Sequence, residues 1–166
     1  MASDDIEQSF KALLKGVADL LKPFGFSKSG TTFRRMSSGN AALISAQRSQ
    51  FSSNDTIRFT FNIAVVSGRL LREEGPDITK AGVMYAHLSE RIGEFLIEPT
   101  DKWWELKAAS DPAALLTDLA KPLELAAQFL INHADDAKLI ALWESGQSPG
   151  LTDGQRRRFL QELKAG

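Results

Sequence analysis

Residues 57–66 read IRFTFNIAVV and decide the fold of this chain of 166 residues. Apolar side chains stand at positions 57, 59, 61, 63 and 65, and Arg58, Thr60 and Asn62 stand between them. A period of two is typical of a β-strand, because successive side chains point to opposite faces of a sheet. The pattern therefore predicts a strand with an apolar face toward the core and a second face that carries Arg58, Thr60 and Asn62.

Neighbouring segments predict an antiparallel sheet around this strand. Residues 31–36 and 41–49 are strand-like, and residues 37–40 between them have the composition of a tight turn. Residues 84–95 fit a strand or a helix equally well, whereas residues 101–106, with adjacent tryptophans, fit a last strand. We expect four to five antiparallel strands.

Helical patterns lie on both sides of the predicted sheet. Residues 6–21 carry apolar side chains at intervals of three and four, and Pro23 ends this helix. After residue 107 we expect three or four helices, with a break at Pro122. Their expected starts are Asp111, Pro122, Asp135 or Asp136, and a capping box of Thr152 and Gln155.

These elements predict an α+β fold with an N-terminal helix, an antiparallel sheet and C-terminal helices packed on the sheet. The length is that of one domain, and no long linker interrupts it. We therefore expect one domain over residues 1–166. Its helix and sheet core would occupy residues 1–106, and a helical extension would occupy residues 107–166.

Charge is unevenly distributed although the net charge is only −1. Residues 22–72 contain eight basic side chains and one acidic side chain, a balance of +7, so the rest of the chain carries −8. Such a basic segment indicates either an anionic partner or an acidic half of the same chain that packs on it. Both interpretations stay open at this point.

The composition also indicates the cellular compartment in which the protein is expected. The chain has no cysteine, which excludes disulfides and thiolate metal sites. Its first residues lack the order of a secretory signal, and no apolar stretch is long enough to cross a bilayer. We expect a cytoplasmic protein with no membrane partner.

Sequence motifs for catalysis are missing. His87 and His133 have no metal-binding spacing, and the motif Gly-x-Ser-x-Gly of serine hydrolases is absent. The segment from Gly25 to Thr31 resembles a phosphate loop, but Thr31 stands where that loop requires a lysine. No catalytic residue, metal or cofactor is predicted, and an enzyme is not favoured, although it is not ruled out.

The polar face of the central strand is the candidate site. Neighbouring strands in register would add polar residues to it, and one of the two adjacent tryptophans would point to this face. A face that is merely solvated is the alternative, since antiparallel sheets commonly have one. The candidate binding residues are Gln47, Arg58, Asn62, His87, Arg91 and Trp103.

Several short segments resemble the bacterial family catalogued as domain of unknown function 4304. They are LLKPFGF (20–26), GTTFRR (30–35), QRS (47–49), FTFNI (59–63), RIG (91–93) and DKWW (101–104). The resemblance spans residues 6–106 and leaves the C-terminal helices outside. It implies a small α+β domain and a strand in residues 84–95, and it implies no activity.

The favoured function is a non-enzymatic binding or interaction module whose basic, polar sheet face meets an acidic protein or a small anion. The alternative is an enzyme or ligand-binding protein for a phosphorylated or carboxylated molecule, with Arg58 and Arg91 holding the anion and His87 as acid–base. Nucleic-acid binding is a weaker alternative, because Phe59 and Phe61 lie on the face opposite Arg58. A pocket that holds His87 and both arginines would favour the enzyme, and a broad face would favour a partner.

Overall fold

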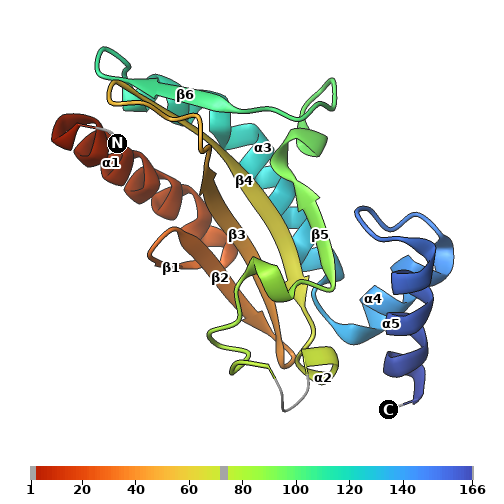
Figure 1. Ribbon diagram of the computed structural model, residues 1–166. Coiled ribbons are helices and arrows are strands. Elements are labelled where there is room, and N and C mark those ends of the chain that lie inside the picture. The colour runs from red at the N-terminus through yellow and green to blue at the C-terminus, as the bar shows by residue number, and fades with distance from the viewer. Residues whose placement is uncertain (1–2, 72–74, 166) are drawn as a thin grey trace.

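The computed structural model describes residues 3–71 and 75–165, and it shows an α+β fold with six antiparallel strands (Figure 1). The fold class predicted from the sequence is confirmed, and a three-residue strand, β1, was not predicted. The helices are α1 (Asp4–Leu21), α2 (Gly68–Leu71), α3 (Pro112–His133), α4 (Asp136–Ser145) and α5 (Asp153–Ala165). The strands are β1 (Ser27–Ser29), β2 (Thr32–Ser37), β3 (Asn40–Arg48), β4 (Thr56–Val66), β5 (Leu88–Arg91) and β6 (Trp104–Lys107).

Strand β4 is the centre of the sheet. The strands follow the order β1-β2-β3-β4-β5, and β6 also pairs with β4. Both short strands fit beside β4 because they use different parts of it: residues 62–65 pair with β5 and residues 56–59 pair with β6. The junction of β5, β6 and β4 therefore brings residues from three distant segments together.

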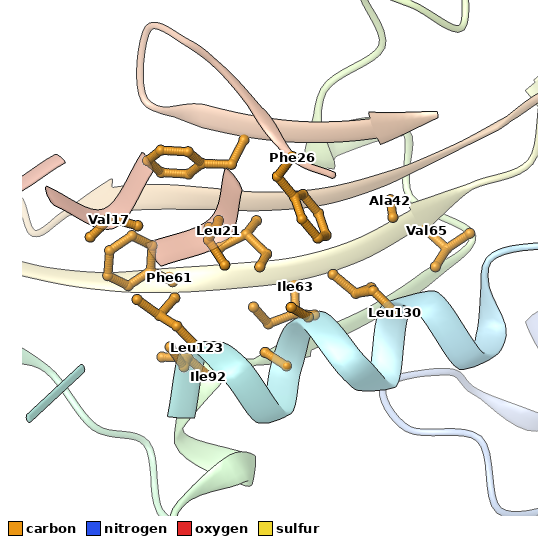
Figure 2. Close-up of a cluster of buried hydrophobic side chains, with 14 of the residues drawn as sticks. Val17, Leu21, Phe26, Ala42, Phe61, Ile63, Val65, Ile92, Leu123 and Leu130 are labelled. Atoms are coloured by element: carbon orange, nitrogen blue, oxygen red, sulfur yellow. The ribbon is translucent and has the colours of Figure 1, made fainter. Parts of the chain in front are cut away.

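The apolar face of β4 lies in the core, as its alternation predicts. Its five apolar side chains at positions 57–65 are at most 1% exposed and join one cluster with side chains of α1 and α3 (Figure 2). The Phe59 ring contacts those of Phe10 at 5.4 Å and Trp104 at 6.3 Å, between ring centroids. Burial of each large apolar side chain contributes about 1.5–3 kcal/mol before the entropy cost of ordering it.

The second face of the sheet is covered over one half. Ala41, Leu43, Ala64 and Val66 form a small apolar cluster with Ala81, and the segment of residues 75–86 packs there. The other half carries polar side chains from β3, β4 and β5. The pattern of the central strand alone predicted a polar face. The structure shows that only one half of this face is polar.

Helix α3 is continuous through Pro122, so the predicted break at this residue was wrong. A proline inside a helix removes one hydrogen bond and costs about 3 kcal/mol. Pro122 nevertheless lies on the buried side of α3, between Leu119 and Leu123, which pack in the core. Tertiary packing of this face outweighs the local cost, and the C-terminal helices number three in the described residues.

The predicted helix starts at Asp111, at Asp135 and at the capping box of Thr152 and Gln155 agree with the structure in their capping bonds. The Asp111 side chain accepts from the Ala113 amide, and that of Asp135 accepts from the Lys138 amide. Thr152 and Gln155 bond to each other's backbone amides, which forms the predicted capping box before α5.

The segments between the main elements form short helical turns and one short strand. Residues 84–95 contain the end of a 3₁₀ turn, η2 (Val83–Tyr85), then β5, then a second 3₁₀ turn, η3 (Ile92–Phe95), so the strand is only four residues long. A third 3₁₀ turn, η1 (Lys22–Phe24), follows α1 at Pro23. The sequence of residues 67–74 predicts a helical turn. Helix α2 forms its first part, and residues 72–74 lie outside the described residues.

Candidate functional site

Strand register brings Gln47, Asn62 and Arg91 to the second face of the sheet. Asn62 of β4 is directly opposite Arg91 of β5, and paired residues of antiparallel strands share a face. The Asn62 side-chain amide donates to Gln47 Oε1 of β3 over 2.7 Å. This bond fixes the orientation of both amides beside Arg91.

Trp103 joins these residues just before β6. The next residue, Trp104, is 6% exposed and points into the core, so the two tryptophans face opposite sides as predicted. The guanidinium carbons of Arg58 and Arg91 lie 6.0 and 5.2 Å from the centroid of the half-buried Trp103 ring. Trp103 therefore contacts two arginines that come from different strands.

Together Gln47, Arg58, Asn62, Arg91 and Trp103 form a surface that we call the polar strip. Thr60, which lies in the same half of the face, is fully buried, and its hydroxyl donates to the Lys102 carbonyl over 2.8 Å. That bond attaches the segment before β6 to the sheet and thereby positions Trp103. Five of the six residues predicted for the site are thus brought together.

Two carboxylates that the sequence analysis did not place also lie on the polar strip. Asp101 accepts from the Trp103 indole N–H over 3.3 Å and lies 3.5 Å from Arg91. Glu105 lies 3.6 Å from Arg58 Nε and 3.7 Å from Lys107. Exposed ion pairs at such distances contribute about 0–1 kcal/mol to the stability of a protein, so these two carboxylates orient the arginines only weakly.

Arg58 keeps unused hydrogen-bonding capacity. Its Nε atom is buried and has no hydrogen-bond partner among the described residues, because the distance to Glu105 is too long. The side chain as a whole is still 39% exposed. The Nε atom itself is shielded from solvent, so a ligand would meet the exposed part of the Arg58 side chain.

The basic residues counted in the sequence do not form one basic patch. Arg48 forms an ion pair with Glu7 of α1, Arg69 contacts Asp136, and Arg34 donates to the Ile78 carbonyl. Within the described part of the chain, the strip's arginines also face Asp101 and Glu105. The expected basic, polar face is therefore a face of mixed charge. The difference arises because pairing between distant segments is invisible in a linear charge count.

A shallow cleft adjoins the polar strip at β5. It has a volume of about 290 Å³ and is lined by Asn62, Arg91, Ser89, Val83 and Gly150. Burial raises the pKa of Glu90, which also lines this cleft, above its ordinary value. The open cleft has room for one amino-acid side chain.

His87 lies apart from the other predicted site residues. Its Nδ1 atom accepts from the Ser67 amide over 3.0 Å, and its ring meets Phe159 of α5 at 5.1 Å. Burial lowers the pKa of His87 to about 4. It borders a separate cleft with Arg158 and Glu162, so the predicted grouping of His87 with Arg58 and Arg91 is not formed.

Within residues 3–71 and 75–165, no group of three or more histidine, aspartate or glutamate side chains could hold a metal ion. In the same residues no helix combines the length and the apolar character that crossing a membrane requires.

The fold and the strip define an α+β protein with helices on one sheet face and an open polar strip on the other. The chain belongs to the family described as domain of unknown function (DUF4304), whose model matches residues 17–131. No curated protein and no solved structure matches the chain.

The family match corrects one sequence-based expectation. It begins within α1 and extends to residue 131, almost the end of α3. The expected limit at residue 106 was wrong, because α3 closes the core over the sheet and belongs to the matched region.

Proposed function

We propose that this protein is a non-enzymatic, cytoplasmic binding module of bacteria whose polar strip recognises an acidic segment of a protein partner. The contact of Trp103 with both Arg58 and Arg91 supports this proposal most directly. Tryptophan and arginine are the residue types that contribute most to binding energy at protein interfaces. Here they lie side by side although they come from β4, from β5 and from the segment just before β6.

The mixed charge of the strip is compatible with an acidic partner. Asp101 and Glu105 are 63% and 48% exposed and hold their arginines at 3.5 and 3.6 Å, so these contacts are weak. A partner carboxylate can form a shorter, bidentate bond with either guanidinium group. The Asn62–Gln47 pair beside them offers further polar contacts.

An open face fits a protein better than a small molecule. Small-molecule sites are concave and enclose most of their ligand, whereas the cleft beside the strip is shallow and His87 lies elsewhere. For this reason we do not propose the alternative of an enzyme that uses His87 with Arg58 and Arg91. One apolar cluster also contains side chains from α1 through α5, which supports our proposal that the chain acts as one domain.

Affinity capture from the source cells tests the proposal. Native protein, Arg58→Glu, Arg91→Glu and the control Arg157→Glu serve as baits; Arg157 is exposed on α5, remote from the strip. We expect one captured protein with an acidic segment that both strip variants lose and the control keeps. Its purified form should then bind the native chain and change its tryptophan fluorescence, to which Trp103 contributes beside Trp104 and Trp143.

The proposal fails if every partner of the native protein is retained by both strip variants, or if the control loses the same partners. Circular dichroism of each bait establishes that loss of capture is not loss of folding.

A further inference from the structure

A groove on the helical side of the sheet gathers three lysines that form no ion pair within the part of the chain that the structure describes. It lies between α1 and the hairpin of β1 and β2 and has a volume of about 530 Å³. Lys11 and Lys15 are one turn apart on α1, and Lys28 of β1 faces them across the groove. All three are exposed, and none forms an ion pair with the described residues.

The one carboxylate that lines this groove is already neutralised. Glu7 accepts two hydrogen bonds from Arg48, over 2.8 and 3.0 Å. The Arg48 guanidinium holds the pKa of the Glu7 carboxyl below its usual value, so this ion pair persists at neutral pH. The three lysines therefore leave the groove with a net positive charge.

The floor of the groove is apolar. Phe10 and Leu14 line it with side chains that are 3% and 4% exposed, and the Arg48 guanidinium carbon lies 5.5 Å from the Phe10 ring centroid. A ligand that neutralises the lysines and also covers this floor would gain both electrostatic and apolar contacts.

A tight turn closes the end of the groove. Gly30 and Thr31 connect Ser29 to its pairing partner Thr32, and Gly30 has a φ of +62°. The two central amides of such a hairpin turn lie outside the strand ladder. No atom lies within 4 Å of the position where a Cβ of Gly30 would stand, so a ligand oxygen can approach the backbone.

This turn belongs to the segment that resembles a phosphate loop but has Thr31 in place of the lysine. In the folded chain, the missing positive charge is supplied from elsewhere, by Lys28 and by Lys11 and Lys15 of α1. We propose that the groove binds a phosphate monoester that carries a compact apolar group. The phosphate, close to a dianion at neutral pH, contacts the lysines and the turn, and the apolar group lies on Phe10 and Leu14.

Titration with phenyl phosphate, followed by amide NMR, tests this site. We expect saturable shifts at Gly30, Thr31 and α1, and at least tenfold weaker binding in the triple variant Lys11→Gln, Lys15→Gln, Lys28→Gln. The control Lys80→Gln changes an exposed lysine on the opposite side of the sheet and should bind like the native chain. Phenol and inorganic phosphate should each bind more weakly than phenyl phosphate, since each lacks one of the two contacts.

Vesicles of phosphatidylcholine with phosphatidic acid identify the source of the phosphate monoester. Binding to both probes with loss in the triple variant indicates a lipid headgroup, and binding to phenyl phosphate alone indicates a soluble molecule. The proposal is overturned if phenyl phosphate does not saturate the groove below about 10 mM, if the shifts lie elsewhere, or if the triple variant binds as tightly as the native chain.

Discussion

The indole ring of Trp103 lies against the guanidinium group of Arg91, with 5.2 Å between the guanidinium carbon and the ring centroid. The two residues are 12 positions apart, and they meet because β5 and the segment that leads into β6 occupy the same side of β4. Asp101 contacts both of them, through the indole N–H and through the guanidinium group. The pair is thus a fixed part of the polar strip.

A double-mutant cycle of Trp103→Ala and Arg91→Ala should give a coupling free energy of about 0.5–1 kcal/mol, the usual value of an exposed cation–π contact. Urea unfolding of the four proteins measures it. The same cycle with Trp103→Ala and Arg157→Ala should give no coupling, because Arg157 lies on α5. Zero coupling in the first cycle would mean that the contact between Trp103 and Arg91 contributes nothing to the free energy of unfolding.

Asn40 should be among the most costly polar residues to replace. It is 1% exposed, its amide donates to the Ala134 carbonyl and to Asp136, and its carbonyl accepts from the Gly68 amide. Asn40→Ala leaves these buried groups unpaired, so we expect a loss of about 2–4 kcal/mol in the free energy of unfolding. Asn54→Ala, at an exposed position, should change it by less than about 0.5 kcal/mol. Similar losses in both variants would contradict this role of Asn40.

The sequence predicted local features of the fold well and long-range pairing poorly. The alternation of β4, the caps at Asp111 and Asp135, and the opposite directions of Trp103 and Trp104 each depend on neighbouring residues, and the structure agrees with them. Asn40, by contrast, reads as a turn residue in the sequence. Its buried bonds join residues 94 and 96 positions away, which no local pattern indicates.

The candidate site shows the same division. The alternation of side chains along β4 was enough to place Arg58 and Asn62 on one face. The pairing of Asn62 with Arg91 of β5 then adds Arg91 to this face. His87 was assigned to this group by alternation alone, whereas contacts with Ser67 and Phe159 draw it into a separate cleft. The predicted helix end at Pro122 is wrong because helix propensity takes no account of the packing that keeps α3 continuous.

Gly93 should tolerate no side chain. A Cβ at this position would overlap the Thr100 carbonyl and would lie 2.9 Å from its carbon, both backbone atoms that cannot rotate away. We expect Gly93→Ala to lower the free energy of unfolding by about 3 kcal/mol and to shift the segment that carries Asp101 and Trp103. Gly82→Ala is the matched control, since nothing lies within 4 Å of its Cβ position, and it should be neutral or slightly stabilising. Thermal unfolding and Trp103 fluorescence measure both effects; equal behaviour of the two variants would contradict the steric argument.

His87 should make the stability depend on pH between about 4 and 6.5. In the folded chain, burial lowers the pKa of His87 from its ordinary value of 6.5 to about 4. The nearby carboxylates of Glu162 and Asp136 raise this pKa by less than burial lowers it, and Arg158 lowers it further. In this window the unfolded chain binds more protons than the folded one, so stability rises with pH and levels off above 6.5. A shift of this size corresponds to about 3 kcal/mol of stability, since one pKa unit is worth about 1.4 kcal/mol.

Urea unfolding across this range measures the effect of His87. In His87→Asn the side-chain oxygen can still accept from the Ser67 amide but does not titrate, so the slope from this residue should disappear. His133→Gln keeps His87 and should keep the slope. An unchanged slope in His87→Asn would show that the neutral, buried imidazole is not its source.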